Sequence, residues 1–134
     1  MAAQSYRVRI QGFDRVEFDE IEGLSGSIES VEFQDGDDLV MRKRPGRVRF
    51  GDITLRRGRL DAANFYHWWY AARAGKLERR RVTIDFLGER NRILLRWRMD
   101  AWPLSWEISA RGRKGEMVAL ESITLAVENA EFSG

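Results

Sequence analysis

Most of the sequence alternates apolar and polar residues with a period of two, and this feature limits the possible folds more than any other. In residues 6–10, YRVRI, the apolar side chains share one parity and the two arginines share the other. Successive side chains of a strand point to opposite faces of a sheet, so the pattern is typical of an antiparallel strand with one buried face. The same alternation occurs in RVEFDEI (15–21), SIESVEF (27–33), RVRFGDITL (47–55), RVTIDF (81–86), ILLRWRMDAW (93–102), LSWEISA (104–110) and VALESITLAV (118–127). The sequence therefore predicts a mainly β chain that folds as an antiparallel β-barrel or sandwich.

The last alternating segment changes phase. Val118 and Leu120 have one parity, whereas the apolar residues from Ile123 to Val127 have the other. A β-bulge places one extra residue in a strand and shifts the parity of everything after it. We therefore predict a bulge near Glu121 and Ser122.

Pro103 separates two of the alternating segments. Proline cannot donate a hydrogen bond to a neighbouring strand, so we expect Pro103 at the start of a strand or at a sheet edge. Trp97 and Trp106 are in phase with the aliphatic residues on either side of Pro103. Both tryptophans are therefore expected in the core.

One segment, LDAANFYHWWYAARAGK (60–76), departs from the period of two. Asp61 is suited to cap the N-terminus of a helix, and Gly75 is suited to the position that follows the C-terminus. Apolar residues between them recur at helical spacing, and these are Phe65, Trp68, Trp69 and Ala72. This stripe predicts one flanking α-helix at about residues 61–74. Three aromatic residues are expected to pack it against the barrel: Phe65, Trp68 and Trp69.

The chain length fits one domain over residues 1–134. A chain of this size buries roughly two-thirds of its unfolded surface, which suffices for one core. No apolar run approaches the roughly 20 residues needed to span a bilayer, so no membrane insertion is expected. The N-terminal segment MAAQSYRVRI has no apolar stretch typical of a signal peptide.

No motif predicts a catalytic, cofactor-binding or metal site. The chain has no cysteine, which excludes disulfides and thiolate chemistry, and His67 is the only histidine. Ser25 in GLSGS lacks the second glycine of the nucleophile elbow. Residues 35–38, DGDD, lack the further ligands of a calcium loop, and AGK at 74–76 lacks the upstream glycine of a phosphate loop. At 100° per residue, His67 lies about 200° around the helix from Phe65, so it is expected outside the buried stripe.

A polarised segment, DGDDLVMRKRPGRVRFGD (35–52), lies between two predicted strands. Three aspartates begin it, three basic residues follow, and a Pro-Gly pair then predicts a bend. We expect an extended loop at about residues 35–50. A nucleic-acid contact is one possible role, because arginine outnumbers lysine 20 to 3, but acidic residues interleave with the basic ones and the net charge is only +2.

With these features in place, the chain resembles the tail-tube proteins of contractile phage tails and of related extracellular injection systems. The segments that carry the resemblance are FDEIEGLSGSIESVEFQDG (18–36), RKRPGRVRFGDITLRRG (42–58), FYHWW (65–69), ILLRWRMDAWPLSWE (93–107) and ALESITLAVE (119–128). They occur in the family's order and cover nearly the whole chain. The effector-carrying ring proteins of type VI secretion are similar in fold, but their sequence pattern matches less well.

The resemblance implies an Hcp-like β-barrel with one flanking helix that forms hexameric rings. The rings would stack into the inner tube of a contractile sheath and deliver DNA or effector cargo. The implied partners are further copies of the chain, a sheath protein, baseplate or spike proteins, tail-terminator proteins and cargo in the lumen. The resemblance implies no enzymatic activity and no cofactor. It also implies assembly in the bacterial cytoplasm and then a place in a phage virion or a contractile injection particle, including one released extracellularly.

The resemblance also assigns the polarised segment to the contact between rings. The residues expected there are Asp35, Asp37, Asp38, Arg42, Lys43, Arg44, Pro45 and Gly46. Their charges would dock one copy onto the next.

Several alternatives stay open from the sequence. Within the family, the chain is either an elongating tube protein or a baseplate tube initiator, and it belongs to either a phage tail or an injection system. Outside the family, the main alternative is a nucleic-acid-binding β-barrel module. An enzyme would need a composite site built across subunits.

Overall fold

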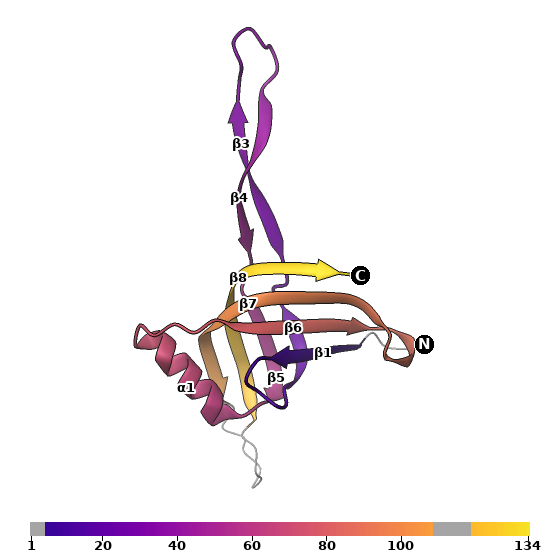
Figure 1. The fold of residues 1–134 in the computed structure, drawn as a ribbon, viewed down its shortest axis with the longest axis vertical. Helices are drawn as coiled ribbons and strands as arrows, with labels where there is room; N and C mark the ends of the chain where they lie inside the picture. Colours follow the sequence, from indigo (N-terminus) through magenta and orange to yellow (C-terminus); the bar gives the residue numbers. More distant parts are fainter. Residues whose placement is uncertain (1–4, 109–118) are drawn as a thin grey trace.

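The computed structural model describes residues 5–108 and 119–134 (Figure 1). Its elements in chain order are β1 (Ser5–Ile10), β2 (Glu17–Glu22), β3 (Gly26–Phe33), β4 (Arg42–Phe50), β5 (Ile53–Arg59), α1 (Ala62–Arg73), β6 (Arg80–Leu87), the short 3₁₀ helix η1 (Glu89–Asn91), β7 (Ile93–Ile108) and β8 (Leu120–Ser133). Six strands form one sheet in the order β1-β6-β7-β8-β5-β2, and β3 and β4 form a separate two-stranded sheet. Every paired strand is antiparallel, which confirms the predicted fold class.

The six-stranded sheet curls into a nearly closed barrel. Its two edge strands, β1 and β2, approach each other, and the Tyr6 hydroxyl donates to the Phe18 carbonyl at 3.0 Å. Gly58 of β5 permits this curvature, because a Cβ there would lie 2.0 Å from the Glu17 carbonyl oxygen. Only glycine allows the backbones of β2 and β5 to come this close.

The predicted parity places the apolar side chains inside the barrel. One core joins residues from all six strands and from α1. Its fully buried members include Leu55, Val82, Ile84, Ile123 and Leu125. The arginines and acids of the opposite parity lie on the outer faces of the strands.

β8 contains the predicted bulge. Ser122 pairs with Glu107 of β7 and Leu120 pairs with Ile108, so Glu121 is an extra residue on β8. The bulge brings Leu120 and Ile123 into the same core. The prediction is confirmed at Glu121, whereas Val118 lies outside the described residues.

Pro103 does not begin a new strand, because residues 93–108 form a single strand, β7, although the pairing of β7 with β8 shifts between Pro103 and Ser105. Pro103 pairs with Leu125 of β8, and the last pair between β6 and β7 is Arg80 with Ala101. Pro103 therefore lies where β7 has a neighbour on one side only, as expected for a sheet edge. The predicted strand residues 109–110 lie outside the described part of the chain.

α1 begins and ends near the predicted positions. The Asp61 carboxylate accepts a hydrogen bond from the Asn64 N–H at 3.1 Å, and Gly75 adopts a φ of +84° directly after the helix. The helix packs along β7, and His67 on it is exposed.

The segment expected to be an extended loop at residues 35–50 is largely strand. Residues 42–50 form β4, which pairs with β3, so the connection between them is shorter than predicted. The predicted bend at Pro45 and Gly46 is an irregularity inside β4, where the pairing shifts between Ile28 and Ser30 of β3. Proline is tolerated there because a bulge leaves a ladder position unpaired. The Pro-Gly pair is thus a strand feature and does not mark a turn.

Candidate assembly surfaces

The β3–β4 hairpin projects from the barrel as an isolated two-stranded ribbon (Figure 1). Apolar residues are exposed along it: Ile28 and Val48 face solvent directly opposite each other, and Leu39 at the tip is 96% exposed. We define the hairpin tip as residues 34–41, which join the two strands. An isolated two-stranded hairpin is marginally stable in water at best. A hairpin with this much exposed apolar surface is suited to contact another molecule.

The hairpin carries five acidic and five basic residues between positions 26 and 50. One opposite pair is satisfied within the copy, because Asp38 accepts from the Val40 N–H and from Arg42 Nε, both at 3.0 Å. The Val40 hydrogen bond, and then that of Arg42, lowers the pKa of Asp38 below its usual value. Asp35, Asp37 and Lys43 remain exposed on the ribbon.

Two residues of β4, the basic strand of the hairpin, lie close to side chains of β3. The Arg44 guanidinium lies 5.8 Å from the centre of the Phe33 ring, which is typical of a cation–π contact. A Cβ on Gly46 would lie 2.9 Å from a Val31 methyl group. Gly46 therefore lets the two strands pack closely at the irregularity beside Pro45.

The three aromatic residues predicted to pack α1 have two different environments. Phe65 and Trp68 are each 2% exposed, and Trp68 Nε1 donates to the Glu78 carbonyl at 2.7 Å. Trp69 is only half-buried, and its Nε1 donates to the Leu104 carbonyl of β7 at 3.0 Å. Trp69 thus lies at the border between the core and a second apolar surface.

This second surface, which we name the α1–β7 aromatic face, consists of Tyr66, Trp69, Tyr70, Leu104, Trp106 and Ile108. The Trp69 and Trp106 rings meet edge to face, with centroids 5.7 Å apart. Tyr66 lies 6.2 Å from both Trp106 and Tyr70. The expectation that Trp106 belongs to the core is wrong: it is 36% exposed. At Trp106, β7 pairs with β8 on one side, but it has run past the end of β6 on the other. The spacing of Tyr66 and Tyr70, one helical turn apart, is the sequence signal that could have indicated this surface.

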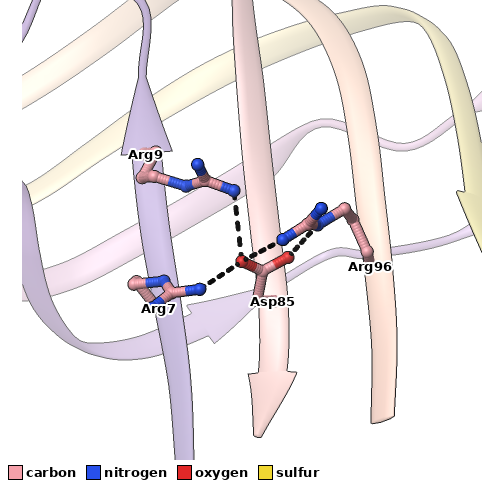
Figure 2. Close-up of polar contacts among 4 residues, drawn as sticks. All are labelled: Arg7, Arg9, Asp85 and Arg96. Atoms are coloured by element: carbon pink, nitrogen blue, oxygen red, sulfur yellow. Dashed lines mark hydrogen bonds and ion pairs between the residues drawn. The ribbon is translucent and has the colours of Figure 1, made fainter. Parts of the chain in front are cut away.

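On the outer face of the sheet, three arginines converge on Asp85 of β6 (Figure 2). Arg96 of β7 contacts both carboxylate oxygens at 2.5 and 3.1 Å, while Arg7 and Arg9 of β1 contact Oδ2 at 2.9 and 3.2 Å. The Asp85 side chain is fully buried. The hydrogen bonds from Arg96, assisted by Arg7 and opposed by burial, lower the pKa of Asp85 to about 2. This cluster joins β1, β6 and β7, and sequence parity alone did not indicate it.

The described residues contain no group of three or more His, Cys, Asp or Glu side chains placed to hold a metal ion. Within the same ranges, no helix is both long and apolar enough to cross a membrane. The exposed large apolar side chains of the described residues include those of the hairpin and of the α1–β7 aromatic face.

Comparisons with known proteins agree with this geometry. A chain from the sheath–tube complex of an extracellular contractile injection system, PVC, in its extended state is 22% identical, with 96% of this chain and 87% of that chain covered and a TM-score of 0.73. A chain from the baseplate of the anti-feeding prophage (AFP) is 19% identical, with 100% and 95% covered and a TM-score of 0.73. Hcp1 from Flavobacterium johnsoniae is 14% identical, with 96% and 94% covered and a TM-score of 0.50. At these identities the solved structures show a shared fold.

No curated protein matches the chain. The family model described as T4-like virus tail tube protein gp19 matches residues 2–131, which is nearly the whole sequence. The resemblance drawn from the sequence motifs is confirmed. The chain belongs to the T4-like virus tail tube protein family and is a structural tube subunit of a phage tail or contractile injection particle.

Proposed function

We propose that the chain forms hexameric rings that stack head to tail into the inner tube of a contractile machine, with the β3–β4 hairpin of each copy docking onto the adjacent ring. The observation that carries the proposal is the hairpin itself, which projects from the barrel with its apolar side chains uncovered (Figure 1). The hexameric count comes from the family resemblance.

Symmetry supports a stacking role for the hairpin. A surface that projects from one end of a molecule and binds a different surface on the next copy makes a heterologous contact. Such a contact propagates as an open filament unless rotation closes it into a ring. A tube of stacked rings needs one contact of each kind, and the hairpin supports the open one.

The charges of the hairpin support docking between like copies. Acidic and basic residues are equal in number between positions 26 and 50, so identical hairpins do not repel one another through net charge. Arg42 is paired with Asp38 in the same copy. The exposed residues left to meet a neighbouring ring include Asp35, Asp37, Lys43 and Arg44.

We also propose which proteins contact the tube, what passes through it and where it assembles. Sheath, baseplate or spike and terminator proteins would contact the assembled tube, and DNA or effector cargo would pass through its lumen. The chain would act without catalysis and without a cofactor, as one domain over residues 1–134. It would assemble in the bacterial cytoplasm before it enters a virion or an injection particle that is released. The relatives in the sheath–tube complex and in the baseplate have the same TM-score, so the proposal covers both elongating and initiating subunits.

Negative-stain electron microscopy of the purified chain over a range of protein concentrations tests this function. Sixfold rings and tubes of stacked rings are the expected particles. A chain that stays monomeric at every concentration and binds single-stranded oligonucleotides with strong salt dependence would instead support the nucleic-acid-binding alternative.

A further inference from the structure

We infer that the α1–β7 aromatic face of one copy is the receptor for the hairpin tip of a second copy. The inference rests on the proposed stacking and adds the surface on which the hairpin docks. The occupant is thus a defined segment of the same chain, residues 34–41.

Both surfaces leave apolar side chains in solvent. The tip exposes three consecutive apolar residues, Leu39, Val40 and Met41, and no part of the barrel covers them. The aromatic face exposes Tyr66 and Tyr70 on α1 together with the end of β7. Large exposed apolar patches mark interaction sites, and tyrosine and tryptophan dominate the binding energy of interfaces. An aliphatic tip inserted among aromatic rings would cover both.

The two surfaces are placed to meet between copies and not within one. The hairpin rises from one end of the barrel, whereas α1 and the C-terminal end of β7 lie on the side away from it (Figure 1). A copy displaced along the hairpin direction brings its α1 side toward the tip of the copy below. This arrangement is the heterologous contact that stacking requires.

Charge complementarity favours the same pairing. Asp35 and Asp37 at the tip are exposed, and neither forms an ion pair with another described residue. The end of α1 presents Arg73, whose guanidinium lies 5.6 Å from the Tyr70 ring, and the exposed Lys76 follows. In the docked arrangement, the two aspartates of the tip would face Arg73 and Lys76 at the edge of the aromatic face. Opposite potentials of this kind fix the register of an interface.

Disulfide cross-linking tests the contact directly, because the chain has no cysteine of its own. The double variant Leu39→Cys with Tyr70→Cys is assembled under reducing conditions and then oxidised. We expect a ladder of covalent oligomers beyond the dimer on a non-reducing gel, which collapses on reduction. Either single variant should give dimers at most. The matched control, Leu39→Cys with Glu89→Cys at an exposed position of η1, should give no ladder.

The outcomes separate the inference from the proposed function. Tubes whose Leu39→Cys site does not link to Tyr70→Cys, or links to Glu89→Cys instead, overturn the inference and leave stacking intact. Wild-type protein that forms neither rings nor tubes overturns the proposed function, and the inference with it.

If the cysteine variants assemble poorly, a series of charge-reversal variants tests the contact between the hairpin tip and the α1–β7 aromatic face. Asp35→Lys with Asp37→Lys should raise the protein concentration needed for tube formation about tenfold or more, because like charges then meet at the receptor. Adding Arg73→Glu with Lys76→Glu should restore assembly. Failure of the second pair to restore what the first pair removed contradicts the inference.

Discussion

Arg96 of β7 donates from Nε and Nη2 to the two carboxylate oxygens of Asp85 on the neighbouring strand β6, at 2.5 and 3.1 Å. Arg7 and Arg9 on β1 reach the same carboxylate from the other side (Figure 2). One buried negative charge thus ties together three adjacent strands, including β1, which is an edge of the sheet. Side-chain ion pairs therefore link β1 to β6 in addition to the backbone pairing between these strands.

Replacing Asp85 with asparagine should destabilise the barrel by about 2–3 kcal/mol. Removing one partner of a fully buried ion pair costs about 3–5 kcal/mol, and the cost is smaller here because Arg7 and Arg9 are about half exposed. Urea denaturation followed by tryptophan fluorescence measures the difference. The control is Asp100→Asn, whose exposed pair with Arg81 should contribute less than about 1 kcal/mol. Equal midpoints for Asp85→Asn and wild type would show that the cluster is dispensable.

The stability of the barrel should also fall in acid through Asp85. Its pKa is lowered from 3.8 to about 2 in the folded protein, so its contribution is complete above about pH 4 and is lost as the pH falls toward 2. Urea midpoints measured between pH 2 and pH 5 should therefore fall more steeply for wild type than for Asp85→Asn. Parallel curves for the two proteins would assign the acid sensitivity to other carboxylates.

The two neighbouring tryptophans of α1 should differ in their contribution to stability. Trp68→Ala removes a buried ring and should cost about 3–5 kcal/mol, as large-to-small core changes do. Trp69→Ala removes a half-buried ring and should cost roughly half as much. Thermal unfolding of the two variants, compared with wild type, gives the order. A larger loss for Trp69→Ala would place the main anchor of the helix on the aromatic face.

Gly58→Ala should disturb the closure of the barrel. The added methyl group would lie 2.0 Å from the Glu17 carbonyl and 2.5 Å from the Phe18 ring, so β2 would have to move away from β5. Overpacking of this kind costs about 1–3 kcal/mol or more. Hydrogen exchange at the amides of β2 locates the effect. Gly26→Ala at the start of β3 serves as a control, because its added methyl group would lie at an ordinary contact distance of 3.5 Å from the Phe50 ring. Unchanged exchange in β2 would argue against the close approach.

The sequence was informative where local rules decide the structure. Alternation predicted the barrel, the helical spacing after Asp61 predicted α1, and the phase change predicted the bulge at Glu121. These features depend on residues close together in the chain. They are read correctly because side-chain parity and capping act locally.

Features that depend on strand length and on distant neighbours were missed. The Pro-Gly pair suggested a loop, but pairing between β3 and β4 continues through it. Trp106 has the parity of a core residue, yet it is exposed because β6 ends before reaching it. The three arginines around Asp85 come from two other strands, β1 and β7, and Arg7 is 78 residues away in sequence. Parity cannot show which outward side chains meet.

If the hairpin tip joins one ring to the next, the variant Leu39→Ser/Val40→Ser/Met41→Ser should fail to stack its rings. The change removes exposed apolar groups without altering charge, so the thermal midpoint of the barrel should equal that of wild type. Negative-stain electron microscopy of both proteins at the same concentration is the measurement. We expect tubes from wild type and separate rings from the variant. Tubes of normal length from the variant would show that the apolar tip does not join the rings.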